Sequence, residues 1–133
     1  MIEKRQFYIN GQWANPAIAH DFDVIDPSTE DVVGVISLGG QADTDAAVAA
    51  AKAAFPSWSQ TSKTERLDLL EKFLEVYQAR QADMAAAISL EMGAPKKLSR
   101  NQQVGAGTWH LQGFINAFKD FEFDRPLGPQ APN

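Results

Sequence analysis

Leu90-Glu91-Met92-Gly93-Ala94-Pro95 closes the longest helical pattern in this chain. The apolar residues before it recur at intervals of three, four or seven, which predicts an amphipathic helical stretch over residues 63–92. They are Leu67, Leu70, Phe73, Leu74, Tyr77, Met84, Ile88 and Met92. Gly93 and Pro95 then act as C-terminal helix breakers. Because the stretch is longer than an ordinary globular helix, we predict a bend or break near residues 79–82.

Downstream, the sequence predicts one more helix over residues 99–121, with Ser99 as its N-cap. Its glycines, Gly105, Gly107 and Gly113, each weaken a helix by about 1 kcal/mol relative to alanine, so we expect close approach of the backbone to a neighbour. The large apolar residues of the later chain are predicted to lie in the core: Trp58, Trp109, Phe114, Ile115, Phe118 and Phe121. The proline-containing tail, residues 122–133, is predicted to be an extended linker.

Upstream, an alanine-rich helix is predicted over residues 43–55, capped by Asp43 or Thr44 and ended by Pro56. Before it lies a β-arm over residues 7–37. Asn10-Gly11 between β-forming residues predicts a hairpin over residues 7–14. The turn Asp26-Pro27-Ser28-Thr29 separates a second short strand pair, residues 22–25 and 32–37. The predicted fold class is therefore α/β, mostly helical, with an N-terminal β-hairpin and a second short strand pair.

Composition excludes several classes of protein. The 133 residues suit one domain or a piece of a larger one, and a net charge of −5 opposes binding to nucleic acid. No stretch resembles a signal peptide or a membrane span, so we expect a soluble, cytoplasmic protein without a membrane partner. There is no cysteine, which excludes disulfides, thiolate metal sites and a thiol nucleophile in this chain.

The residues offer no self-sufficient active site. Gly105-Ala106-Gly107 lacks the third glycine of a dinucleotide loop, because His110 stands there, and no strand precedes it. His20 and His110 have no partners at a recognisable metal-ligand spacing. The serines stand where caps and turns need them, and none has the glycine frame of a nucleophile elbow, which argues against a small hydrolase.

Five motifs follow one another in a distinctive order. They are the hairpin Phe7 to Trp13, the turn Asp26 to Thr29, the helix end Ala53 to Trp58, the stretch Glu65 to Leu69 and the stretch Leu90 to Pro95. In this order they resemble the N-terminal part of the aldehyde dehydrogenase superfamily across nearly the whole chain. Ala94 stands where many relatives carry lysine, which is a common variation.

The resemblance implies a longer parent enzyme that binds NAD or NADP on a Rossmann-like domain and oxidises an aldehyde to a carboxylic acid. In the family, a cysteine thiolate attacks the aldehyde, a glutamate activates water and an asparagine stabilises the oxyanion. All three belong to later parts of the family's sequence. We therefore expect no catalytic and no cofactor-binding residue here, no cofactor for this chain alone, and no activity of the 133 residues by themselves.

Two pairs of positions can still be carried over. In relatives, backbone before the Asp-Pro-Ser-Thr turn and the acid of the Leu-Glu motif hold a monovalent cation, which implies Ile25 and Glu91 here; the alternative is an ordinary strand end and a helix-terminal acid. The helix after that motif borders the aldehyde tunnel in relatives. By position, this implies Gln102 and Ala106 as substrate-channel residues.

The expected partner is the remainder of the parent enzyme, in a homo-oligomer. Without it, apolar surface would be exposed and the chain would self-associate. We expect residues 1–133 to be the N-terminal segment of such an enzyme, cut short naturally, by proteolysis or in the laboratory. A different possibility is a stand-alone, non-catalytic helical interaction module derived from that scaffold.

Overall fold

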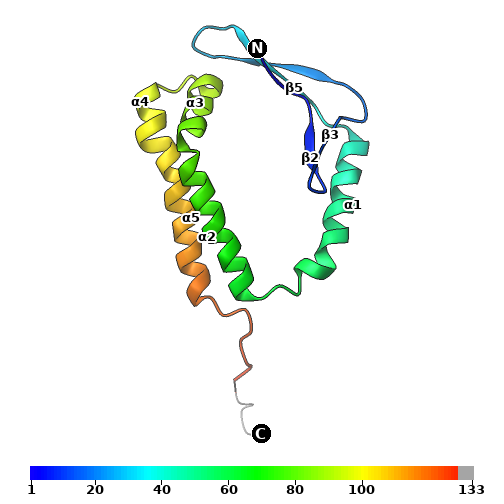
Figure 1. The fold of residues 1–133 in the computed structure, drawn as a ribbon, viewed down its shortest axis with the longest axis vertical. Helices are drawn as coiled ribbons and strands as arrows, with labels where there is room; N and C mark the ends of the chain where they lie inside the picture. The colour runs from blue at the N-terminus through cyan, green and yellow to red at the C-terminus, as the bar shows by residue number, and fades with distance from the viewer. Residues whose placement is uncertain (129–133) are drawn as a thin grey trace.

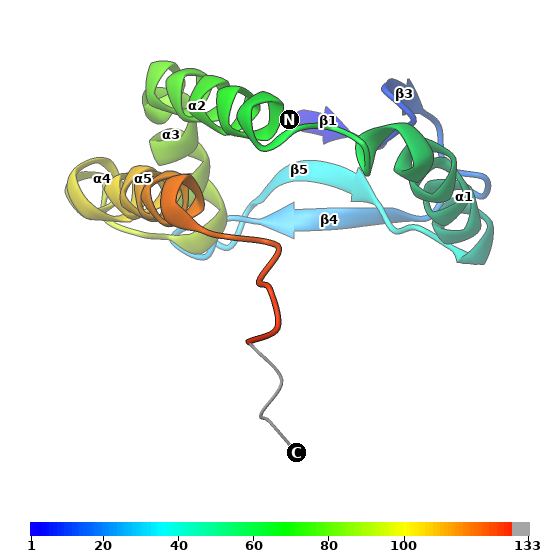
Figure 2. The ribbon, with the colours of Figure 1, turned by 90° about the horizontal axis from the view of Figure 1, so that it is seen from below.

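The computed structural model describes residues 1–128 and has the α/β class that the sequence predicts. Strands and the first helix form one side of an open ring, and the remaining helices form the other (Figure 1). A 90° turn of the view shows the sheet lying between the two helical parts (Figure 2). No helix in this range is long and apolar enough to cross a membrane.

The predicted hairpin is confirmed. Strands β2 (Phe7–Ile9) and β3 (Gln12–Ala14) pair antiparallel. The turn between them needs positive φ at both positions, and Asn10 and Gly11 have φ values of 53° and 75°. The Tyr8 and Trp13 rings stack edge to face across the pair, with centroids 5.2 Å apart.

The second strand pair is confirmed but belongs to a three-stranded sheet. Strands β4 (Asp21–Ile25) and β5 (Val32–Ser37) pair antiparallel, and the Glu30 N–H donates to the Asp26 carbonyl oxygen in the turn. The additional strand, β1 (Ile2–Lys4), runs parallel to β5 and gives the order β1-β5-β4. The predicted β-arm of residues 7–37 therefore begins too late.

Helix α1 (Gln41–Trp58) is longer at both ends than the predicted 43–55. Gly40 is its N-cap, not Asp43 or Thr44, because the Asp43 carboxylate reaches back to the Gly40 N–H at 2.8 Å. Pro56 lies inside the last turn and does not end the helix. A proline lacks an N–H donor and crowds the carbonyl one turn earlier, but it does not affect the carbonyl of the residue before it. The last turn is therefore completed by the bond from the Ser59 N–H to the Phe55 carbonyl at 2.8 Å.

The predicted helical stretch 63–92 is two helices, α2 (Lys63–Ala79) and α3 (Gln81–Met92). The predicted break is at Arg80, which leaves helical geometry at φ −108° and ψ 16°. At the start of α2, the Ser62 side chain accepts the Glu65 N–H, and the Glu65 carboxylate accepts the Ser62 N–H. Gly93 ends α3 in the left-handed conformation, with φ 67°.

The predicted helix 99–121 is wrong in its start and in its regularity. Helical structure begins directly after Pro95 with the short α4 (Lys96–Leu98), passes through a π-helical turn, η1 (Ser99–Gln103), and continues as α5 (Val104–Asp120). Ser99 is not the predicted N-cap: its backbone is already helical, with φ −56° and ψ −50°, and its side chain is fully buried. Residues 121–128 form no helix or strand, and the rest of the predicted linker, residues 129–133, lies outside the described range.

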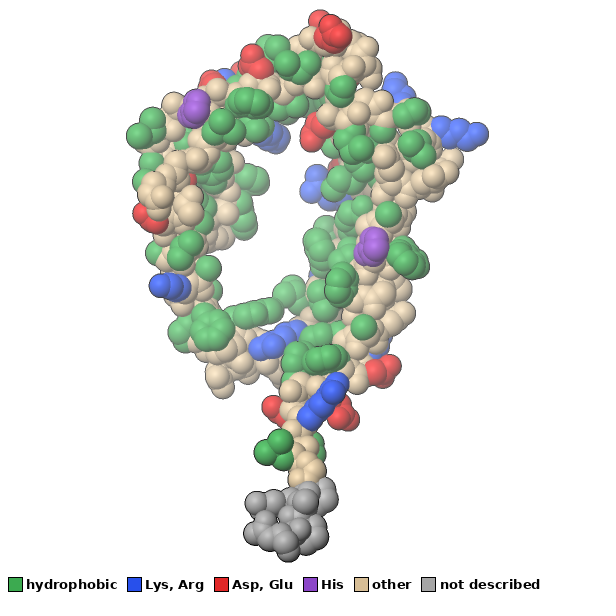
Figure 3. Space-filling model, turned by 180° about the vertical axis from the view of Figure 1, so that it is seen from behind, with side chains coloured by type: hydrophobic (Ala, Val, Ile, Leu, Met, Phe, Trp, Pro, Cys, Tyr) green, Lys and Arg blue, Asp and Glu red, His purple; other side chains and the backbone are tan. Residues whose placement is uncertain are grey.

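The core is very small. Within residues 1–128, the buried apolar side chains are only Val35, Leu74, Ala85, Val104 and Ile115. The prediction that Trp109 and Phe114 are core residues is wrong, because they are 71% and 69% exposed. Trp58 and Phe121 are also exposed. Figure 3 shows an opening through the molecule with hydrophobic side chains along its rim, so most apolar surface has no partner within the described chain.

Candidate functional site

One candidate site lies where the turn after β4 meets the C-terminal end of α3. A Cβ atom placed on Gly93 would lie 3.2 Å from both the Pro27 Cγ and the Ser28 Oγ atoms, so backbone and turn are in direct contact. Ile25 and Glu91 each precede this contact by two residues, and both are exposed. The fold thus brings together the two segments that carry the predicted cation ligands.

A hollow of about 650 Å³ lies beside this contact. Its polar lining comes from the turn, from α3 and from η1, and includes Asp26, Ser28, Ser89 and Arg100. Residues 1–128 hold no cluster of three His, Cys, Asp or Glu side chains that could bind a metal ion. A cation between these segments would therefore depend on backbone carbonyl oxygens and on a few side-chain oxygens such as those of Glu91 and Asp26, the kind of oxygen ligands that hard cations take.

The second candidate is the outer face of η1 and α5. Gln102 and Ala106, the predicted channel residues, are both exposed. Trp109 and Gly113 follow at helical intervals of three and four residues, so the four positions form one stripe along the helix. We call them the outer stripe.

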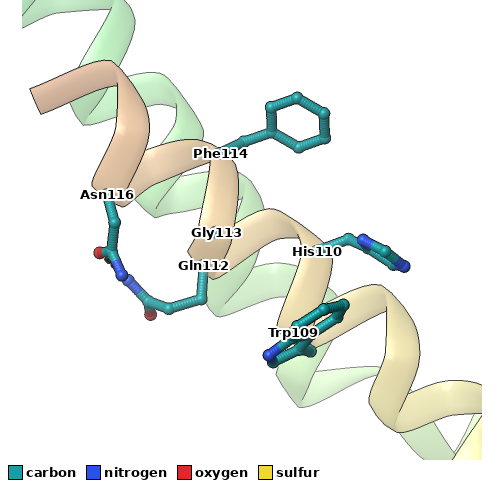
Figure 4. Close-up of a pocket in the computed structure, with 6 residues that line it drawn as sticks. All are labelled: Trp109, His110, Gln112, Gly113, Phe114 and Asn116. Atoms are coloured by element: carbon teal, nitrogen blue, oxygen red, sulfur yellow. Dashed lines mark hydrogen bonds between the residues drawn. The ribbon is translucent and has the colours of Figure 1, made fainter. Parts of the chain in front are cut away.

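The outer stripe leads into a hollow of about 320 Å³ around Gly113 (Figure 4). Trp109 stacks on His110 with ring centroids 4.8 Å apart, and the Gln112 amide donates to the Asn116 side-chain oxygen at 3.0 Å. A Cβ atom on Gly113 would meet no atom within 4 Å. The hollow is therefore lined by aromatic rings and by an amide pair, with open space at Gly113.

The opposite face of α5 is fixed on α2 and α3. The Tyr77 hydroxyl donates to the Val104 carbonyl oxygen at 3.0 Å, and the Gln81 amide donates to the Thr108 hydroxyl at 2.7 Å. Gly107 permits this approach, because a Cβ atom there would overlap the Tyr77 phenol group. The prediction that the glycines mark close backbone approach is confirmed at Gly107 and wrong at Gly105 and Gly113, where a Cβ atom would meet no atom within 4 Å.

A chain of side-chain hydrogen bonds through the buried Ser99 supports the π-helical turn. The Ser89 hydroxyl donates to the Ser99 hydroxyl at 3.0 Å, and Ser99 donates to the Gln103 side-chain oxygen at 3.3 Å. The Val104 N–H reaches the Ser99 carbonyl, the wide spacing of a π-helix. Sequence reasoning missed the roles of Tyr77 and Ser99; the unusual glycine at position 107 was the one signal that could have indicated the former.

The segment Gly105-Ala106-Gly107 does not have the geometry of a dinucleotide loop. Gly105 and Gly107 lie inside α5, where their N–H groups belong to the helix ladder and no strand leads into them. A phosphate needs free N–H groups at a helix N-terminus, which these glycines do not present.

Both the sequence and the fold of this chain are similar to those of known proteins. Residues 13–126 match the sequence model of the Aldehyde dehydrogenase family. An aldehyde dehydrogenase from Bartonella henselae is 52% identical, with a TM-score of 0.91 over 92% of this chain and 26% of that one. Aldehyde dehydrogenase C from Pseudomonas syringae, in a complex with NAD⁺ and octanal, is 37% identical, with a TM-score of 0.90 over 93% of this chain and 26% of that one.

A third relative is 3-succinoylsemialdehyde-pyridine dehydrogenase from Pseudomonas sp, 43% identical over 96% of this chain. The open α/β ring is thus the architecture of part of an aldehyde dehydrogenase, and the chain belongs to the aldehyde dehydrogenase family. It spans only 27% of the length of that relative. The resemblance that the sequence motifs indicated is confirmed, and it concerns the N-terminal segment of the family.

Proposed function

We propose that this chain is the N-terminal part of an NAD(P)-dependent aldehyde dehydrogenase. The parent enzyme would convert an aldehyde, NAD(P)⁺ and water into a carboxylic acid, NAD(P)H and a proton. Two relatives support this reaction class: one is named as a semialdehyde dehydrogenase, and another was solved with NAD⁺ and octanal. Either NAD or NADP suits the proposal, because neither would be bound by the residues described.

The single observation that carries the proposal is the open ring with its unpartnered apolar surface. Helix α1 contains no buried residue, and large apolar side chains such as Phe55, Phe73 and Trp109 are each more than half exposed. A domain of this length ordinarily buries most of its apolar side chains. The remainder of a dehydrogenase, which in the relative is about 73% of the sequence, would cover these exposed apolar side chains.

We further propose that the 133 residues are inactive alone. Aldehyde oxidation by this family's route needs a thiolate nucleophile, and the chain has no cysteine. The chain's role would be to support the catalytic and cofactor-binding parts within a cytoplasmic homo-oligomer. Residues 1–133 would then form one N-terminal segment, not an independent domain.

Two site assignments belong to this proposal. Ile25, through its carbonyl oxygen, and Glu91 would hold a monovalent cation where β4 meets the end of α3. Gln102 and Ala106 would border the aldehyde channel, with the outer stripe as its wall. Replacing Ala106 with tryptophan in the parent enzyme should raise KM more for long aldehydes than for short ones; equal KM changes across aldehyde sizes would remove this assignment.

The first experiment is the intact mass of the protein from its source, together with the gene sequence beyond codon 133. A several-fold larger mass, a downstream cysteine and NAD(P)-dependent aldehyde oxidation would support the proposal. A stop codon after Asn133 and a matching mass would contradict it and favour a stand-alone interaction module. The purified 133-residue chain, assayed with octanal and both nucleotides, should show no turnover.

A further inference from the structure

The first turn of α5 is held from one side only. Its inner face touches α2 and α3 through Tyr77 and Gln81, while Gly105 on the other side has no atom within 4 Å of a Cβ position. Gln102 and Ala106 share the exposed side. Whatever sets the rotation of this turn therefore also sets where the outer stripe lies.

The Tyr77 hydroxyl donates to the backbone where the π-helical turn η1 meets α5. Val104 is 1% exposed and stands at the junction of η1 and α5, where the hydrogen-bond spacing changes from that of a π-helix to that of an α-helix. A helix can shift its register at such a turn by moving the extra residue along the chain. A hydrogen bond to the Val104 carbonyl oxygen, at 3.0 Å, pins that junction.

Gly107 shows that the contact is specific. Its missing side chain lets the Tyr77 phenol group lie against the helix backbone, an approach that any other residue would block. Tyr77 and Gly107 therefore act as one fitted pair. Earlier in the chain, the buried Ser99 hydroxyl accepts a hydrogen bond from Ser89 on α3 and donates one to Gln103 within η1. The π-helical turn is therefore held at its start by Ser89 and at its end by Tyr77.

We propose that Tyr77 is a positioning residue for the aldehyde channel. By fixing the junction of η1 and α5, it sets the position of Gln102 and Ala106 and thereby the aldehyde length that the channel accepts. The inference rests on the proposed function, because it needs the outer stripe to line a channel in the parent enzyme. Tyr77 itself contacts no substrate; it acts through the backbone of Val104.

The test compares Tyr77→Phe with Tyr8→Phe in the parent enzyme. Both variants lose one phenol hydroxyl; Tyr8 is 64% exposed on the hairpin and serves as the matched control. Loss of one neutral hydrogen bond corresponds to a change of about threefold to tenfold in an equilibrium constant. We expect KM for octanal to rise by about that factor in Tyr77→Phe, with KM for acetaldehyde and kcat for both aldehydes unchanged.

Hydrogen exchange gives a readout that does not depend on activity. Amides of residues 102–108 should exchange faster in Tyr77→Phe than in Tyr8→Phe, with the rest of α5 unchanged. An unaltered ratio of the two KM values, or equal exchange in the two variants, would overturn the positioning role. A wild-type parent enzyme that oxidises neither aldehyde would instead overturn the proposed function, while the exchange result would still report on the junction.

If Tyr77→Phe fails to fold, Gln81→Met removes the neighbouring anchor on Thr108 and provides a second test. The same selective rise in KM for octanal is expected, because this bond holds the next turn of the same helix face. A general loss of thermal stability without a change in the KM ratio would show that these contacts serve folding alone and would overturn the proposal.

Discussion

The Asp43 carboxylate accepts a hydrogen bond from the Ala17 N–H, which lies 26 residues earlier in the chain, at 2.8 Å. Its second oxygen accepts the Gly40 N–H at the start of α1. One side chain thus joins the loop after the hairpin to the first helix. Both bonds need the ionised carboxylate as acceptor, and they lower the pKa of Asp43 below its ordinary value of 3.8, the Gly40 bond contributing most.

This arrangement predicts a loss of local order in acid. Because the pKa of Asp43 is lower in the folded state than in the unfolded state, its stabilising contribution is present above the unfolded pKa of about 4 and is lost as the pH falls through the folded value. Hydrogen exchange should show protection of residues 40–44 at pH 6 that declines towards pH 3 beyond the general trend of the chain. Asp43→Asn should lower this protection at pH 6, whereas Asp45→Asn should leave it in place; equal protection in the two variants would contradict the prediction.

Gly107 and Gly105 should respond to alanine with opposite signs. Gly107→Ala forces a methyl group into the Tyr77 phenol group, and such overpacking costs about 1–3 kcal/mol. Gly105→Ala adds a methyl group in open space and improves helix propensity, which should stabilise by up to about 1 kcal/mol. Urea unfolding followed by circular dichroism measures both changes. Destabilisation by Gly105→Ala as large as that by Gly107→Ala would show that the contact with Tyr77 is not the cause.

Turns and helix ends could be predicted where one or two neighbouring residues determine the backbone conformation. Asn10-Gly11 specifies a hairpin because both residues tolerate positive φ, and Gly93 ends α3 for the same reason. The cation and channel residues came from the family resemblance alone. The structure places Ile25 and Glu91 on contacting segments and Gln102 and Ala106 on one exposed face; their roles stay predictions.

The failures have non-local causes. Strand β1 has only three residues and forms through parallel pairing with β5, some thirty residues away. Three residues are too few to show the alternation of apolar and polar side chains by which a strand is predicted. The π-helical turn depends on the buried Ser99 and its partners on α3 and η1. The sequence predicts Trp109 and Phe114 in the core because large apolar residues are usually buried within a domain, but no element within residues 1–128 covers them.

Ser62 should contribute measurably to α2. Its hydroxyl accepts the Glu65 N–H at 3.2 Å, and its own N–H donates to the Glu65 carboxylate, which lowers the pKa of that carboxylate. Loss of such an N-cap costs about 1 kcal/mol. Thermal unfolding of Ser62→Ala should therefore show a lower Tm. Thr64→Ala, two residues further along the chain and also exposed, is the control. An equal decrease of Tm in both variants would argue against the capping role.

Gly93→Ala should destabilise more than Gly11→Ala. Both glycines have positive φ, 67° and 75°, so both variants carry the backbone strain of about 1–2 kcal/mol that a side chain meets there. Only at Gly93 would the methyl group also press on Pro27 and Ser28. The difference in unfolding free energy between the two variants measures that contact. Equal values would show that the turn after β4 can move away from α3 without cost.

The isolated 133-residue chain should self-associate through its open apolar faces. Trp109 and Phe114 are the most exposed aromatic side chains on α5, and soluble monomers rarely leave such surface uncovered. Sedimentation velocity should show a mass that rises with concentration, and replacing both residues by glutamine should lower it. Leu127→Gln is the control, because that side chain is 99% exposed but lies apart from the helices in the tail. A compact monomer at all concentrations, melting cooperatively, would contradict both this prediction and the proposal that the ring needs the rest of a dehydrogenase to cover it.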